Sequence, residues 1–105
     1  MGSEYSIHPD GTGDSLTDEI LEDLLCRLPD YHGKTVAGGQ ITYEFRGSNT
    51  RAAPDTLPDV NVGLSENCVT LCQFGDYRIA ALVLGALVME LVSASRSERI
   101  EVVKP

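Results

Sequence analysis

Apolar residues recur with a helical period between positions 15 and 28. Ser15, followed three residues later by Asp18, is typical of a helix N-terminus, and Pro29 ends the pattern. We therefore predict an amphipathic helix in this segment. At 100° per residue its apolar stripe consists of six side chains: Leu16, Ile20, Leu21, Leu24, Leu25 and Leu28.

Strict alternation of apolar and polar residues predicts strands further along the chain. Ile41, Tyr43 and Phe45 alternate with polar residues, as in a strand that is buried on one face. The segment 68–74 is apolar on both faces, which is typical of a central or covered strand. The predicted strands are 40–46, 59–64, 68–74 and 100–103.

A second helix is predicted over 77–94, with Asp76 as its N-terminal cap. This helix is apolar on all sides, and such a helix is either buried within its own chain or shared with another chain. We expect the second case, a homodimer. Its candidate interface consists of Leu82, Gly85, Ala86 and Met89.

The element order α-β-β-β-α-β predicts an α+β fold, a two-layer sandwich with a mainly antiparallel four-stranded sheet and two helices. The strand 100–103 follows the long helix, so we expect it to pair in parallel through a right-handed crossover. Residues 1–14 contain three glycines, one proline and no periodicity, and we interpret them as a flexible lead-in. Residues 15–105 are then a single domain.

Acidic residues are concentrated in the first third of the chain. The formal net charge is −8, with sixteen Asp and Glu against eight Lys and Arg. This balance disfavours nucleic acids and anionic membranes as partners, because both attract surplus cations. The acidic face of the first helix is either a solvated surface or a docking surface for a basic protein. It consists of Asp18, Glu19, Glu22 and Asp23.

The polar connection 47–58 is longer than a tight hairpin requires. Long ordered loops often carry function, but flexible surface loops are equally common. We keep both interpretations. The candidate binding residues in and beside this loop are Asn49, Arg51, Asp55 and Asp59.

Nucleophilic chemistry could involve His32 or one of the three cysteines. Cys68 and Cys72 lie about 13 Å apart on an extended strand, too far for a mutual disulfide or for one metal ion. The thiolate of Cys26 is disfavoured by the carboxylates around it. We expect no metal and no cofactor. An odd cysteine count, no leader pattern and an apolar run of only 79–89 lead us to expect a cytoplasmic protein.

Three functions are compatible with these features. The first is a small acidic protein-binding module, an inhibitor, immunity-type or adaptor protein that also self-associates, with a basic protein as one candidate partner. The alternative is a regulatory domain that binds a small molecule in a cleft lined by Tyr43, Phe45 and Phe74. The third is an enzyme that uses His32 or a cysteine.

Overall fold

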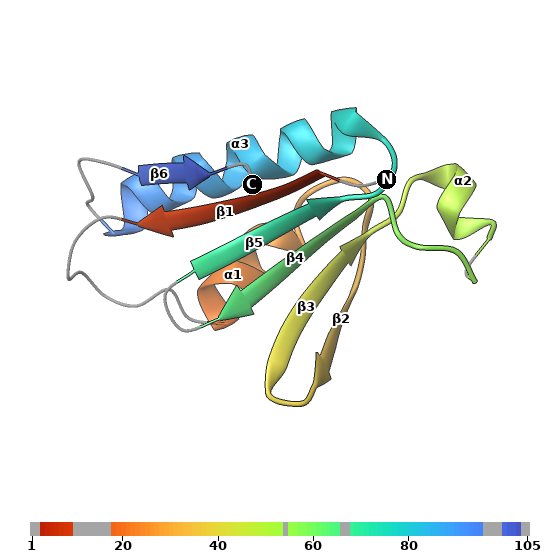
Figure 1. Cartoon of the computed structure of the whole chain (residues 1–105), viewed down its shortest axis with the longest axis horizontal. Helices are drawn as coiled ribbons and strands as arrows, with labels where there is room; N and C mark the ends of the chain where they lie inside the picture. The colour runs from red at the N-terminus through yellow and green to blue at the C-terminus, as the bar shows by residue number, and fades with distance from the viewer. Residues whose placement is uncertain (1–2, 10–17, 54, 66–67, 96–99, 104–105) are drawn as a thin grey trace.

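A computed structural model describes residues 3–9, 18–53, 55–65, 68–95 and 100–103. Six strands form one sheet in the order β2-β3-β4-β5-β1-β6, and each pair of neighbours is antiparallel (Figure 1). Along the chain the elements are β1 (Ser3–Pro9), α1 (Asp18–Leu25), β2 (Tyr31–Ala37), β3 (Gln40–Phe45), α2 (Ser48–Arg51), β4 (Val60–Ser65), β5 (Cys68–Gln73), α3 (Tyr77–Ser95) and β6 (Ile100–Val103).

The two long helices form a layer against the sheet. α3 contacts β5, β1 and β6, whereas α1 contacts β3 and α3. In Figure 1, α1 lies behind β4 and β5, and α3 runs beside β1 and β6. The molecule is therefore a helix layer against a wide antiparallel sheet.

The register of the strands explains where the core lies. Val62 on β4 is opposite Tyr43 on β3 and Leu71 on β5, and Val69 is opposite Ile7 on β1. Because side chains alternate along a strand, these residues share one face of the sheet. The fully buried core consists of Ile7, Leu21, Leu25, Tyr43, Phe45, Val60, Val62, Val69, Leu71, Val83 and Leu87, with Ile79 and Ala80 at its margin.

The predicted four-stranded sheet with two helices in the order α-β-β-β-α-β was wrong. The first missed strand, β1, lies within residues 1–14, which we had interpreted as a flexible lead-in. β1 has only Tyr5 and Ile7 as large apolar residues, and Pro9 favours a loop. Pairing with β5 on one side and β6 on the other makes it a strand despite this composition.

The second missed strand, β2, forms a hairpin with β3. Gly38 and Gly39 have φ values of 58° and 77°, and a two-residue turn with both φ values positive is the usual hairpin connection. At the other end of this hairpin the pairing slips by one residue between Tyr31 and Gly33. β2 contains few apolar residues, and its Lys34 side chain bonds to acids of α1, so the sequence shows no hydrophobic alternation there.

The last strand also differs from expectation. β6 pairs antiparallel with β1, whereas we had expected a parallel crossover. The predicted position of β5 in the interior of the sheet is confirmed, because β4 and β1 flank it. The start of the first helix at Ser15 lies outside the described residues. Within the described ranges, no helix is long and apolar enough to cross a membrane.

Candidate functional site

Asp59 organises the loop that we predicted as a binding segment. Only 7% of Asp59 is exposed, and its carboxylate accepts hydrogen bonds from Gly47 N at 2.7 Å, Thr50 Oγ1 at 2.6 Å and Asp76 N at 3.0 Å. Burial alone would raise the pKa of this carboxyl. The three hydrogen bonds and the nearby Arg46 charge outweigh burial and hold the pKa below its usual value. The Asp59 carboxylate thus has a structural role, because its hydrogen bonds all join parts of this chain.

Two neighbours complete this polar cluster. A Cβ atom at Gly75 would collide with the Asp59 carboxylate, so the site requires glycine there. Arg46, which is 6% exposed, donates hydrogen bonds to the carbonyl oxygens of Thr50 at 3.1 Å and Thr56 at 2.9 Å. Two buried charged side chains, Asp59 and Arg46, therefore hold the loop through hydrogen bonds to its backbone and to Thr50.

The other three predicted binding-loop residues do not form a common surface with Asp59. Arg51 donates hydrogen bonds to the carbonyl oxygens of Arg46 at 2.9 Å and Tyr31 at 3.0 Å, which links the loop to β2. Asn49 and Asp55 are exposed. Of the four residues, Asp59 and Arg51 thus make structural contacts, whereas Asn49 and Asp55 face solvent.

The predicted acidic helix face is divided in a similar way. Lys34 Nζ lies 2.6 Å from Asp18 Oδ2 and 2.9 Å from Glu22 Oε2, and the Tyr43 hydroxyl donates to the Asp18 carboxylate. The hydrogen bonds from Lys34 and then Tyr43 lower the pKa of Asp18. Burial, and then the bond to Asp18, raise the pKa of Tyr43. Two of the four acids therefore attach α1 to the sheet.

The other two acids of that face point outward. Glu19 is exposed, and Asp23 Oδ2 lies 2.8 Å from the Arg27 guanidinium, with both side chains of this pair about two-thirds exposed. An exposed pair of this kind contributes little to stability. Glu19 and Asp23 are thus the exposed members of the face, and Asp23 is paired with Arg27.

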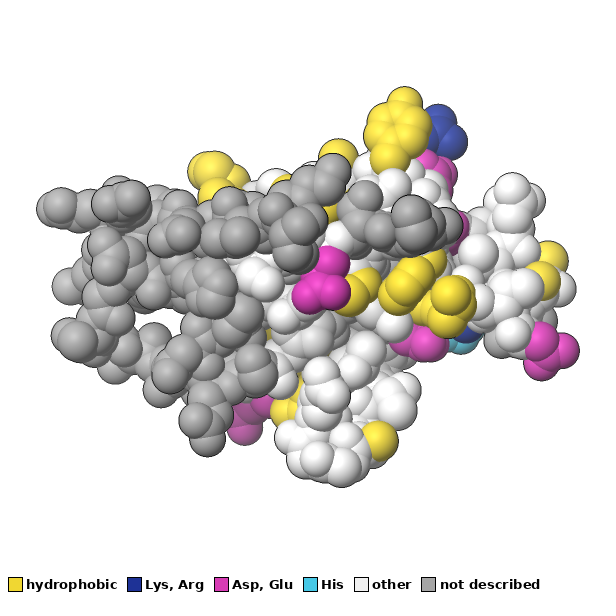
Figure 2. Space-filling view, in the orientation of Figure 1, with side chains coloured by type: hydrophobic (Ala, Val, Ile, Leu, Met, Phe, Trp, Pro, Cys, Tyr) yellow, Lys and Arg dark blue, Asp and Glu magenta, His cyan; other side chains and the backbone are white. Residues whose placement is uncertain are grey.

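The outer face of α3 is apolar and exposed. Tyr77 is 70% exposed, Leu82 46% and Met89 68%, and Gly85 is exposed between them, while Ala86 is half-buried. Figure 2 shows hydrophobic side chains that protrude from the edge of the molecule along which α3 runs. Isolated exposed apolar residues are ordinary, but a row of them on one helix indicates an interaction surface.

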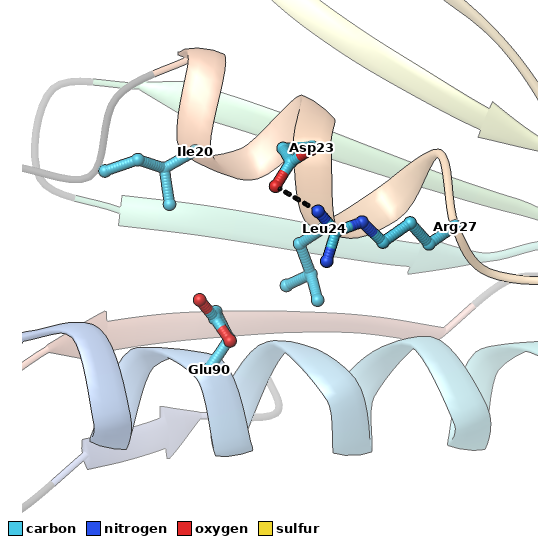
Figure 3. Close-up of a pocket in the computed structure, with 5 residues that line it drawn as sticks. All are labelled: Ile20, Asp23, Leu24, Arg27 and Glu90. Atoms are coloured by element: carbon cyan, nitrogen blue, oxygen red, sulfur yellow. Dashed lines mark hydrogen bonds and ion pairs between the residues drawn. The ribbon is translucent and has the colours of Figure 1, made fainter.

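A groove of about 330 Å³ separates α1 from α3 (Figure 3). Ile20 and Leu24 form its apolar floor, and the Asp23–Arg27 ion pair lies on the α1 side. Glu90 approaches from α3 on the other side. In the described part of the chain no side chain pairs with the Glu90 carboxylate, which lies beside this apolar floor.

The residues that could support catalysis are scattered. His32 is exposed on β2 and Cys26 is exposed after α1, while the side chain of Cys68 lies outside the description. Burial and then the charge of Glu4 raise the pKa of the Cys72 thiol, which disfavours the thiolate. Among the described residues, no group of three or more His, Cys, Asp or Glu side chains could hold a metal ion.

The aromatic residues proposed to line a small-molecule cleft are not gathered at one opening. Tyr43 and Phe45 have no exposed surface, and the Phe45 ring packs edge-on against Tyr31. Phe74 is exposed at the end of β5. These three side chains do not share an accessible cavity.

Sequence reasoning missed Arg46, Lys34 and Glu90. Arg46 directly follows β3 and Lys34 lies on β2, and both are charged residues, so nothing local identified them as buried or paired. Glu90 ends the long apolar run of α3, and that interruption was the available signal. Its position opposite Ile20 depends on how the two helices pack.

Comparison with protein-family models, with curated proteins and with solved structures found no match.

Proposed function

We propose that this protein is a protein-binding module, of the inhibitor or adaptor kind, that receives a basic and partly apolar segment of its partner between α1 and α3. The observation that carries the proposal is the groove itself, in which the apolar floor of Ile20 and Leu24 adjoins Glu90, an acid with no partner among the described side chains. The net charge of −8 favours a basic partner over an acidic one.

The charges of the groove define the segment that would fit. Arg27 already compensates Asp23, so Glu90 is the acid that remains for a partner's Lys or Arg. An apolar side chain next to that cation would cover Ile20 and Leu24. Such an arrangement corresponds to an amphipathic helix lying in a groove between two helices.

The polar loop is a less suitable binding surface than the groove between α1 and α3. Asp59 and Arg51 are occupied with contacts inside the chain, as described above. Binding a partner through them would require breaking these hydrogen bonds within the chain, which costs stability. Opening the groove between α1 and α3 to a partner breaks none of these bonds.

A synthetic amphipathic peptide of 14 Leu and Lys residues tests the proposal. We expect a fluorescently labelled form to bind the full chain, measured by anisotropy, with an affinity that falls as salt rises. The matched Leu and Glu peptide should not bind. Equal binding of the two peptides would contradict recognition of a basic segment.

Two charge reversals localise the binding. Glu90→Lys and Asp55→Lys change the net charge equally, but only Glu90 lies in the groove. We expect Glu90→Lys to weaken binding by about tenfold and Asp55→Lys by less than about twofold. The same loss for both variants would mean that the peptide responds to overall charge and not to this site.

A further inference from the structure

Four residues on the outer face of α3 form a ladder with a spacing of four residues. Tyr77, Ala81, Gly85 and Met89 are all exposed. A Cβ atom at Gly85 would have no atom within 4 Å, so packing inside the chain does not require glycine there. Glycine destabilises a helix interior, so its presence at the centre of an exposed apolar row needs another reason.

We propose that a second copy of this chain covers the ladder, with the two α3 helices antiparallel. The ladder contains a large, a small, a small and a large residue in either direction. A twofold axis at its centre therefore places Tyr77 of each copy against Met89 of the other, and Ala81 against Gly85. Rows with four-residue spacing pack at about 50°, the commonest crossing angle, and such an interface is isologous.

The surface beside the ladder has the shape that this pairing needs. A hollow of about 230 Å³ lies at the Tyr77 end of α3. Met89 projects about 18 Å further along the helix, at 1.5 Å per residue. Antiparallel pairing brings each Met89 to the hollow of the other copy, and methionine adapts well to irregular gaps. The hollow is lined by Tyr5, Gln73, Tyr77, Ala80, Ala81 and Leu84.

The charge distribution permits two acidic chains to meet on this face. From Tyr77 to Met89 the one charged residue is Arg78, whose guanidinium already contacts Asp76. Between these two positions the pairing therefore opposes no carboxylates, although each chain carries −8. Glu90 and the groove lie on the flank of α3 that faces α1, so this inference goes beyond the proposed function and can fail independently of it.

Sedimentation of the full chain tests the pairing directly. Because crossed helices bury a small area, we expect weak association, with the mass rising from 11.3 kDa toward twice that value between about 10 and 500 µM. Met89→Glu should remain monomeric throughout. Leu57→Glu is the matched control, since Leu57 is 63% exposed but lies on the polar loop, and it should associate like the wild type.

Gly85→Ala separates this interface from a general apolar effect. The added methyl group has open space within the chain and favours the helix, so the melting temperature of the monomer should rise. The same methyl group would meet Ala81 of the other copy, so we expect association to weaken by about threefold or more. A wild-type chain that stays monomeric at the highest concentration would overturn the proposal, as would equal losses in Met89→Glu and Leu57→Glu.

Discussion

The polar loop at one end of the sheet and the helix layer on its face use their side chains in opposite ways. In the loop, Asp59 and Arg46 are almost completely buried, and their polar atoms bond to neighbouring backbone and hydroxyl groups. In the helix layer, Tyr77 and Met89 are largely exposed, and Glu90 has no partner among the described side chains. A polar sequence is therefore no guide to which surface remains available for binding.

The difference follows from what burial costs each kind of group. A buried carboxylate without partners is very unfavourable, so Asp59 stays ionised in the interior because hydrogen bonds surround it. An exposed apolar side chain costs much less, and a fold can retain several of them. The surface that can bind a partner is consequently the one whose side chains make few contacts within the chain.

The largest effect is expected in the polar loop. Asp59→Ala removes the acceptor for Gly47 N, Thr50 Oγ1 and Asp76 N, and we expect the free energy of unfolding to fall by about 3 kcal/mol. Urea denaturation measures this loss. Asp55→Ala, an exposed change in the same loop, should stay within about 0.5 kcal/mol of wild type. Similar values for the two variants would mean that Asp59 does not hold the loop.

Two Gly→Ala substitutions sharpen the comparison, because one should lower the free energy of unfolding and the other should raise it. At Gly75 the new Cβ would collide with the Asp59 carboxylate, and we expect a loss of about 1–3 kcal/mol in unfolding free energy. At Gly85 the Cβ has open space, and we expect a gain of about 0.5–1 kcal/mol in dilute solution. Thermal denaturation of both variants checks the pair, and a loss at Gly85 would show that its outer face is not open.

Acid should weaken the contacts of both Asp59 and Asp18. Both carboxyls have pKa values below 3.8 in the folded chain, so the unfolded chain binds more protons and stability rises with pH. Their contributions are complete above about pH 5 and are lost as the pH falls through the folded-state values. The urea midpoint of the wild type should therefore drop between about pH 5 and pH 3, and Asp18→Asn should flatten that slope. An unchanged slope would contradict a lowered pKa at Asp18.

The sequence predicted the elements whose hydrophobic pattern agrees with their environment. β3 has clean alternation and α3 a long apolar run, and both lie where expected. β1 and β2 were missed because their apolar residues are few, and their strand conformation depends on pairing with distant segments.

For the candidate site, the sequence identified the acidic face of α1 and the apolar character of α3, but it did not show which of their residues are free to bind a partner. Asp18 and Asp23 look equivalent in the sequence, yet Lys34, sixteen residues away, binds only the first. Likewise, Asp59 and Asp55 differ only through contacts made at long range. Such assignments require the register of the sheet and the packing of α1, which local patterns do not contain.

The most direct test of the account is a titration of the ¹⁵N-labelled chain with the Leu and Lys peptide, followed through backbone amide shifts. We predict that the largest changes fall on residues 20–27 and 86–90, at the groove between α1 and α3, and that residues 47–59 stay unperturbed. Changes concentrated in 47–59, or spread evenly over all acidic positions, would contradict the assignment of binding to the helix layer.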